Sequence, residues 1–131
     1  MSPPPETEAE LLHLADWEEL VVFRIVRLPD AMANDYVESF KSHFELGIPP
    51  RGPEQSHPLV YEGISVYDTY EAAASTARKF PTIGSYVAKL MITAETNARY
   101  FRWGPPGHLT LWGDSLTLAH TTVDTISVNA T

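Results

Sequence analysis

The run LVVFRIVRL, residues 20–28, constrains the fold of this chain more than any other segment. Its dense β-branched and aromatic residues favour a β-strand over a helix. Apolar side chains occupy both alternating sets of positions, so both faces of the strand need to be covered. We therefore expect an inner strand of a sheet, with other elements packed on each side of it.

Arg24 interrupts one of these apolar faces. A guanidinium removed from water costs several kcal/mol unless a partner and hydrogen bonds compensate. One explanation is structural: an ion pair with an acid such as Asp68, Asp114 or Asp124, or a strand end that reaches water. The other is functional: Arg24 lines a cleft, and the carboxylate or phosphate of a ligand is its partner. The sequence leaves both explanations open.

The rest of the chain alternates between helical and strand patterns. Further strands are expected over 63–68, 85–93, 98–103, 108–112 and 121–128, helices over 33–46 and 69–79, and one or two helical turns within 8–15. This order predicts an α+β fold, a single domain over residues 8–131. We expect a mixed or mostly antiparallel sheet of about five to six strands with about two to three helices. Residues 1–7 contain three consecutive prolines and are expected to form a disordered tail.

The two longer helices have recognisable spacings and ends. Three apolar side chains recur at helical spacing over 33–46: Val37, Phe40 and Phe44. Gly47 marks the end of this helix, and a proline-rich stretch over 47–58 follows as an ordered surface loop. Asp68 and Glu71 have the capping-box spacing that predicts the start of the second helix.

The net charge of −8 is unevenly distributed along the chain. The first 19 residues contain no basic residue and six acidic ones: Glu6, Glu8, Glu10, Asp16, Glu18 and Glu19. The remainder is nearly balanced, and six of its nine basic residues are arginines, which bind carboxylates and phosphates bidentately. A small anionic ligand fits this composition, whereas a nucleic-acid duplex does not.

The chain has no cysteine, which excludes disulfides, thiolate catalysis, iron–sulfur clusters and cysteine-based zinc sites. No stretch approaches the length of about 18–20 apolar residues that a membrane span needs. The N-terminal segment is acidic where a secretory signal would be basic and then apolar. We therefore expect a soluble, cytoplasmic protein without membrane contact.

The segment GISVYDT leads from a strand directly into a helix. Ser65 and Tyr67 lie on one face of this strand, and Thr69 lies at the helix N-terminus, where backbone N–H groups favour an anion. A simpler interpretation is that Asp68 and Thr69 cap the helix while the Tyr67 ring packs. With Arg24, the residues Ser65, Tyr67 and Thr69 are candidates for ligand binding.

The segment GHLTLWGD carries two candidate catalytic residues, His108 and Asp114. Histidine titrates near neutral pH and serves as acid, base or hydrogen-bond anchor, although a lone histidine is more often structural. Arg102, in the run ARYFRW, is a further ligand-binding candidate because cations beside aromatic rings favour nucleotides. The five histidines show no metal-ligating spacing, so no metal site is expected.

Several segments together resemble an uncharacterised family of small bacterial proteins. They are the Phe40, Ser42, Gly47, Pro49 and Pro50 pattern, GISVYDT, the alanine-rich helix, FPTIGSYVAKLMI and HLTLWGD, which cover most of residues 20–128. More distantly, the order of elements is similar to that of small ADP-ribosyltransferases. That resemblance implies that Arg24 holds the NAD ribose or phosphate, that Ser65 or Tyr67 orients the nicotinamide, and that Asp114 supplies the late acid. No glutamate follows Glu95, where that family carries its catalytic one.

Two functional hypotheses follow. The first is a nucleotide-like anionic ligand bound in an ADP-ribosyltransferase-like cleft, with NAD as a substrate and no other cofactor. The second is a non-catalytic interaction module that uses the acidic N-terminal segment to bind a protein partner or a second copy of the chain. The first requires Arg24, Tyr67, His108 and Asp114 to converge, and the second leaves them scattered.

Overall fold

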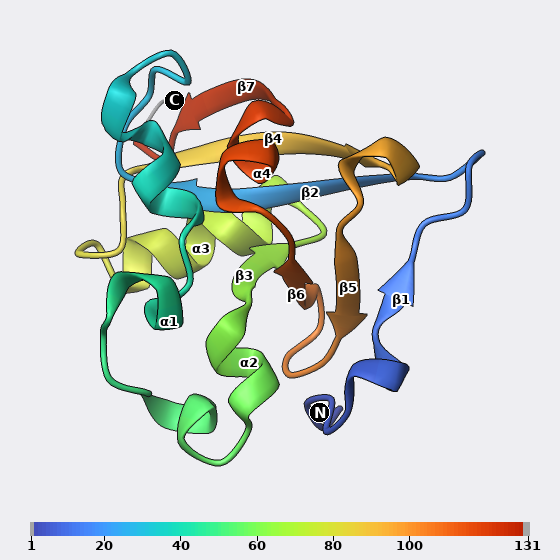
Figure 1. The fold of residues 1–131 in the computed structure, drawn as a ribbon. Coiled ribbons are helices and arrows are strands. Elements are labelled where there is room, and N and C mark those ends of the chain that lie inside the picture. The colour runs from blue at the N-terminus through green and yellow to red at the C-terminus, as the bar shows by residue number, and fades with distance from the viewer. Residues whose placement is uncertain (1, 130–131) are drawn as a thin grey trace.

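The computed structural model describes residues 2–129 and contains one sheet in which every pairing is antiparallel. Its seven strands are β1 (Leu12–His13), β2 (Glu19–Val26), β3 (Ile64–Tyr67), β4 (Tyr86–Thr93), β5 (Arg99–Arg102), β6 (His108–Trp112) and β7 (Thr122–Ser127). They lie in the order β1-β5-β6-β3-β2-β4-β7 (Figure 1). The expected α+β class is confirmed, and the expected count of five to six strands is too low.

Short helices fill the connections between the strands. The α-helices of the described residues are α1 (His43–Leu46), α2 (Pro58–Glu62), α3 (Tyr70–Lys79) and α4 (Ser115–His120). The 3-10 helices are η1 (Glu8–Glu10), η2 (Asn34–Phe40), η3 (Gly52–Gln55) and η4 (Ala94–Thr96). The sequence predicted fewer helices because segments of four to six residues show less than two turns of periodicity.

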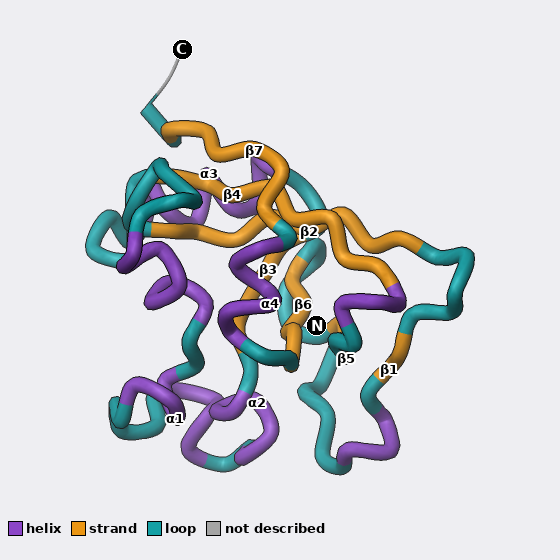
Figure 2. Tube along the Cα trace, turned by 45° about the horizontal axis from the view of Figure 1, so that its top comes forward, coloured by secondary structure: helices purple, strands orange, loops and turns teal. Residues whose placement is uncertain are grey.

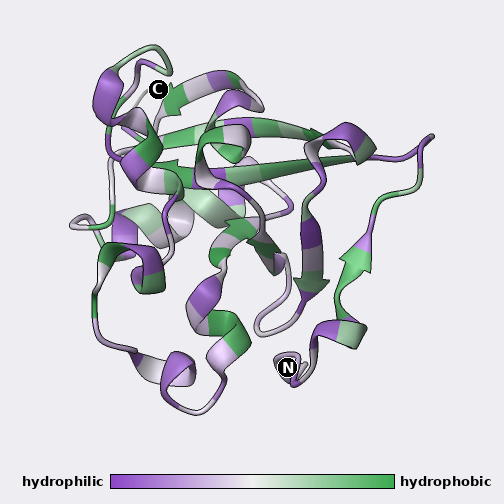
Figure 3. Cartoon of the chain, viewed as in Figure 1, coloured by the Kyte–Doolittle hydropathy of each residue, from purple (hydrophilic) through white to green (hydrophobic). Residues whose placement is uncertain are grey.

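The strand β2 lies inside the sheet between β3 and β4, as its double-sided apolar pattern predicts. On one face, Val22 and Val26 are fully buried in the main core, which η2 and α4 cover. On the other face, Ile25 packs against the alanines of α3. Figure 3 shows hydrophobic residues running along both β2 and β4. Both faces of this strand are therefore covered.

The sheet is divided at the junction between β2 and β3. Every residue of β2 from Glu19 to Val26 has a partner in β4, whereas β2 meets β3 at the single pair Phe23 and Tyr67. Figures 1 and 2 show β2 and β4 running across the direction of β3 and β5. The strands β2 and β3 therefore separate after Phe23, and Arg24 is the first residue beyond the junction.

The helix expected over 33–46 is interrupted. It consists of η2 and α1, separated by Lys41 and Ser42, whose backbones are extended. Ser42 starts the second helix by accepting a hydrogen bond from the Glu45 N–H, and Gly47 ends it with φ 70° as expected. Phe40 is buried in the core while Phe44 is 57% exposed, so the two do not share one buried face.

The helical turn expected within 8–15 is present as η1, whereas residues 12 and 13 of the same stretch pair with Tyr100 and Arg99 as the edge strand β1. The expectation for the start of α3 is corrected. The side chain that caps α3 is Thr69, one residue after the expected Asp68, and it accepts a hydrogen bond from the Ala72 N–H. The disordered tail over residues 1–7 stays a prediction, with Met1 outside the described residues.

Candidate functional site

Arg24 lies on the face of β2 that points into the main core. Its Nε donates to the carbonyl of Ser39, 2.9 Å away, and its Nη1 donates to the carbonyl of Ser65 at 2.8 Å. A guanidinium has several further N–H donors. No other described residue accepts a hydrogen bond from them, so they remain available at the open side of the guanidinium.

The acids considered from the sequence do not pair with Arg24. Asp68 forms an ion pair with Arg102. Asp114 and Asp124 accept hydrogen bonds from N–H groups close to them in sequence. Among the residues that the structure describes, no carboxylate lies within ion-pair distance of the Arg24 guanidinium. The hypothesis of an internal structural ion pair therefore finds no support here.

Burial disfavours the charge of this guanidinium without removing it. Loss of solvent around Arg24 lowers the pKa of the guanidinium to about 10, and a Coulombic effect of Tyr67 partly opposes that shift. At neutral pH the side chain is therefore still a cation. Its two hydrogen bonds go to neutral carbonyl oxygens, so no formal negative charge among the described residues balances it.

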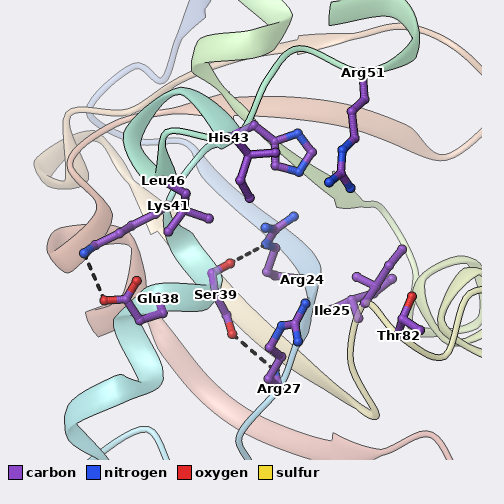
Figure 4. A pocket seen from close by; sticks show the side chains of 12 residues that line it. Arg24, Ile25, Arg27, Glu38, Ser39, Lys41, His43, Leu46, Arg51 and Thr82 are labelled. Carbon is purple, nitrogen blue, oxygen red and sulfur yellow. Dashed lines mark hydrogen bonds and ion pairs between the residues drawn. The ribbon is translucent and has the colours of Figure 1, made fainter.

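A cavity of about 300 Å³ lies beside Arg24, where β2 separates from β3. Figure 4 shows the side chains of Arg24, Arg27, His43 and Arg51 directed toward this space. Lys41 also lines it but is held by Glu38 at 3.0 Å. We call this space the large cavity. Four Lys and Arg side chains against one carboxylate make it strongly basic.

The large cavity also has an apolar wall. Four aliphatic side chains from three segments line it: Ile25, Leu46, Ile48 and Ile83. A basic wall facing an apolar wall suits a ligand that carries an anionic group beside a flat or apolar one.

A second space of about 90 Å³ adjoins the first, and we call it the small cavity. Arg24, Lys41 and His43 line both spaces, so these residues stand at their boundary. The small cavity differs in character because Glu54 and Ser42 contribute to its wall. One continuous ligand could therefore meet cations in one space and an acid in the other.

His43 and Glu54 form a hydrogen-bonded pair at the boundary. The Nδ1 of His43 lies 2.9 Å from Oε1 of Glu54, and the same oxygen accepts the backbone N–H of Arg51 at 2.9 Å. The Glu54 side chain is 15% exposed. These bonds tie α1 to η3, so the proline-rich loop forms one wall of the site.

The structure connects Ser65, Tyr67 and His108, which the sequence did not predict. His108 Nδ1 lies 2.8 Å from the carbonyl of Trp103, which only accepts, so Nδ1 carries the proton. Burial lowers the pKa of His108, which favours the neutral ring. Its Nε2 then accepts the Ser65 hydroxyl at 3.0 Å, and the Tyr67 ring packs edge-on against it at 5.7 Å.

Ser65 links this group to Arg24 while keeping the two on opposite sides of the sheet. Its carbonyl accepts from Arg24 and its hydroxyl contacts His108. Tyr67 pairs with Phe23 and shares its face, whereas Arg24 follows Phe23 and points to the other face. Neither Tyr67 nor His108 lines the large or the small cavity.

The remaining predicted residues lie away from the two cavities. Thr69 caps α3, and Arg102 pairs with Asp68 beside the turn before His108. Asp114 caps α4, where the backbone N–H of Thr117 lowers the pKa of the Asp114 carboxyl. The structure therefore brings Ser65, Tyr67 and His108 together on one face of β3 and places Arg24 beside the two cavities on the other face. Arg102 lines a separate pocket with His108, whereas Thr69 and Asp114 lie at helix starts. The convergence of Arg24, Tyr67, His108 and Asp114 that the first hypothesis requires is not found.

Most residues of the cavities were not among the sequence candidates, including Arg27, Lys41, His43, Arg51 and Glu54. Arg51 and Glu54 come from the loop over 47–58, whose proline content predicts order but not position. The signal that was available is the run PPRGPE, because a charged pair within a rigid turn points to a fixed role.

The described residues contain no group of three or more His, Asp or Glu side chains arranged to hold a metal ion. Among the same residues, no helix is long and apolar enough to cross a membrane. Comparison of the chain with protein-family models, with curated proteins and with solved structures finds no match.

Proposed function

We propose that this protein binds a nucleotide-like ligand through its phosphate in the cleft where β2 and β3 separate. The observation that carries the proposal is Arg24, a largely buried cation without a described carboxylate partner that faces the large cavity. A buried charge normally has an ionic partner, because the loss of hydration is costly. A phosphate oxygen in the large cavity would be that partner.

The surroundings of Arg24 support an anionic occupant. Arg27 and Arg51 lie on the same cavity and form no ion pair with any described residue. Arginine presents parallel N–H groups that match phosphate oxygens bidentately. Like charges repel one another where acids are outnumbered, so an anion between these arginines stabilises the folded protein.

NAD is the nucleotide that the resemblance to ADP-ribosyltransferases favours, with Arg24 on the first long strand and Ser65 and Tyr67 on the next. In this proposal Arg24 holds a phosphate in the large cavity. The hydrogen-bonded pair of Ser65 and His108 lies on the opposite face of the sheet. The Asp114 carboxylate accepts hydrogen bonds from the N–H and the hydroxyl of Thr117 at the start of α4, so it would have to break them to serve as the late acid. We therefore propose that the protein binds NAD. Whether it also cleaves NAD is tested by a separate measurement.

The binding test is calorimetric titration of NAD, ADP-ribose and AMP into the wild type and an Arg27→Ala, Arg51→Ala double variant. Both substitutions lie on exposed positions, so we expect the variant to fold. We expect the wild type to bind at least one of the three ligands and the variant to bind it at least about tenfold more weakly. Arg99→Ala, on β5 and outside both cavities, is the matched control.

The proposal fails if folded wild-type protein gives no heat with any of these ligands. It also fails if the Arg99→Ala control weakens binding as much as the double variant does. Release of nicotinamide from NAD, followed by chromatography, separates an enzyme from a binding protein.

One observation favours the interaction module as a second candidate. Trp17 is 86% exposed and lies among Asp16, Glu18 and Glu19. A large exposed aromatic ring surrounded by acids is typical of a contact residue for a basic partner surface. If the partner is a second copy, the mass measured by light scattering should rise with concentration for the wild type and not for Trp17→Ser. An equal mass for both proteins at all concentrations would contradict self-association.

A further inference from the structure

The small cavity differs from the large one in the hydrogen-bonding groups left open to a ligand. The Oε2 of Glu54 receives no hydrogen bond from any described residue, while Oε1 is held by His43 and Arg51. Ser42 is 3% exposed, and its hydroxyl oxygen accepts the Glu45 N–H, which leaves its own O–H without a described acceptor. Both residues line the small cavity.

These two open groups are complementary to a hydroxyl. A carboxylate oxygen accepts a hydroxyl hydrogen, and a serine O–H donates to a hydroxyl oxygen. No buried side-chain oxygen of the described residues lacks a partner, so Oε2 is open to solvent and free to accept a hydrogen bond from water or from a ligand that donates. A phosphate would accept the Ser42 O–H but suits Glu54 poorly, because it would bring a second negative charge beside that carboxylate.

The size of the small cavity fits a ring rather than a single water molecule. A water needs about 10–15 Å³ of such space, and this cavity offers about 90 Å³. Since Arg24, Lys41 and His43 line both spaces, a group in the small cavity lies next to a phosphate in the large one. The two cavities therefore fix the direction in which a ligand lies.

We infer that the small cavity binds the hydroxyl groups of a phosphorylated sugar, with Glu54 as the residue that selects for them. This inference rests on the proposed function, because the phosphate occupies the large cavity beside Arg24. The sugar hydroxyls then donate to Oε2 of Glu54 and accept from Ser42. The shared chemistry is a sugar phosphate, whether free or part of a nucleotide.

A pair of ligands tests the inference without altering the protein. Ribose 5-phosphate and cyclopentylmethyl phosphate share a five-membered ring and a phosphate, and only the first carries hydroxyls. We expect the wild type to bind ribose 5-phosphate about tenfold more tightly, as a charge-assisted hydrogen bond predicts. Equal affinities for the two ligands would overturn the inference.

A pair of variants tests whether Glu54 is the residue that selects for the sugar hydroxyls. Glu54→Gln preserves an oxygen for His43 and for the Arg51 N–H but removes the charge, so we expect the preference for ribose 5-phosphate to fall several-fold. Glu45→Gln, an exposed acid on α1 outside both cavities, should keep it. Retention of the full preference by folded Glu54→Gln would overturn the role of Glu54.

Inorganic phosphate and AMP distinguish the remaining outcomes. Wild-type binding of phosphate without any preference for ribose 5-phosphate refutes the sugar site and leaves the proposed phosphate site standing. Absence of binding of all four ligands refutes both. Tighter binding of AMP than of ribose 5-phosphate assigns the sugar to a nucleotide, and weaker binding assigns it to a free sugar phosphate.

Discussion

At the scale of single residues, Arg24 shows how a polar side chain within an apolar strand defines a site. Its position was visible from the sequence because charge breaks the alternation of β2. Its partners were not, because Ser39 and Ser65 contribute backbone carbonyls, which every residue type has. Residues that act through side chains leave a sequence signal, and residues that act through the backbone do not.

His108 gives a prediction about pH. Burial holds the pKa of folded His108 below the usual value of 6.5, whereas unfolding restores that value. The unfolded state therefore binds the proton more readily, and protonation destabilises the fold as the pH falls from above 6.5 toward the depressed pKa. Urea midpoints measured between about pH 7.5 and pH 5 should fall less steeply for His108→Gln than for the wild type.

The comparison of His108→Gln with the wild type isolates this histidine, because the acids and the other histidines are common to both proteins. Equal slopes of stability against pH would show that burial does not shift the pKa of His108.

At the scale of elements, the sequence predicted the long strands well and the short helices poorly. The strands β2 and β4 have eight residues each, enough for an apolar pattern to repeat. In contrast, β1 has two residues, and its pairing with β5 depends on where the chain returns. Tertiary contacts determine the secondary structure of such short segments, and the local sequence pattern does not predict those contacts.

The start of α3 gives a prediction about stability. Thr69 caps this helix through the Ala72 N–H at 3.1 Å, so Thr69→Ala should destabilise the protein by about 1 kcal/mol. Thr69→Ser retains the hydroxyl and should lose much less. Both are measured by urea unfolding, and binding of AMP should be the same in both variants because Thr69 lines neither cavity. A loss of AMP binding in Thr69→Ala but not in Thr69→Ser would indicate that the Thr69 hydroxyl contacts the ligand.

The approach of β3 to β6 gives a second prediction at this scale. A Cβ at Gly63 would lie 2.4 Å from Cγ2 of Thr110 and 3.0 Å from the carbonyl of Leu111. Gly63→Ala should therefore destabilise the protein by about 1–3 kcal/mol, since overpacking forces the two strands apart. At Gly113 the nearest atom to such a Cβ is 3.4 Å away, so Gly113→Ala is the control. Equal melting temperatures of the two variants would contradict this close approach.

At the scale of the whole molecule, the division of the sheet creates the site. Because β2 and β3 share one residue pair, the two halves of the sheet diverge and leave the basic cleft between them. The strand order was not predictable from the sequence, since β3 pairs with β2 and β6 across long stretches of chain. The cleft depends on that strand order, so the sequence did not predict that Arg51 and Glu54 line it.

The charge of the cleft predicts an effect of anions on stability. A ligand that binds the folded state alone raises the melting temperature in proportion to the logarithm of its concentration. Pyrophosphate should therefore raise the melting temperature of the wild type by several degrees relative to chloride at equal ionic strength. The Arg27→Ala, Arg51→Ala variant should show a much smaller increase. An equal increase in both proteins would mean that pyrophosphate acts elsewhere.

Nuclear magnetic resonance of the arginine Nε–H groups during titration with AMP tests the phosphate site directly. We expect the signals of Arg24, Arg27 and Arg51 to move with one binding curve while those of Arg78 and Arg99 stay in place. Movement of Arg78 or Arg99 alone, or of no arginine at saturating AMP, would contradict a phosphate site at Arg24.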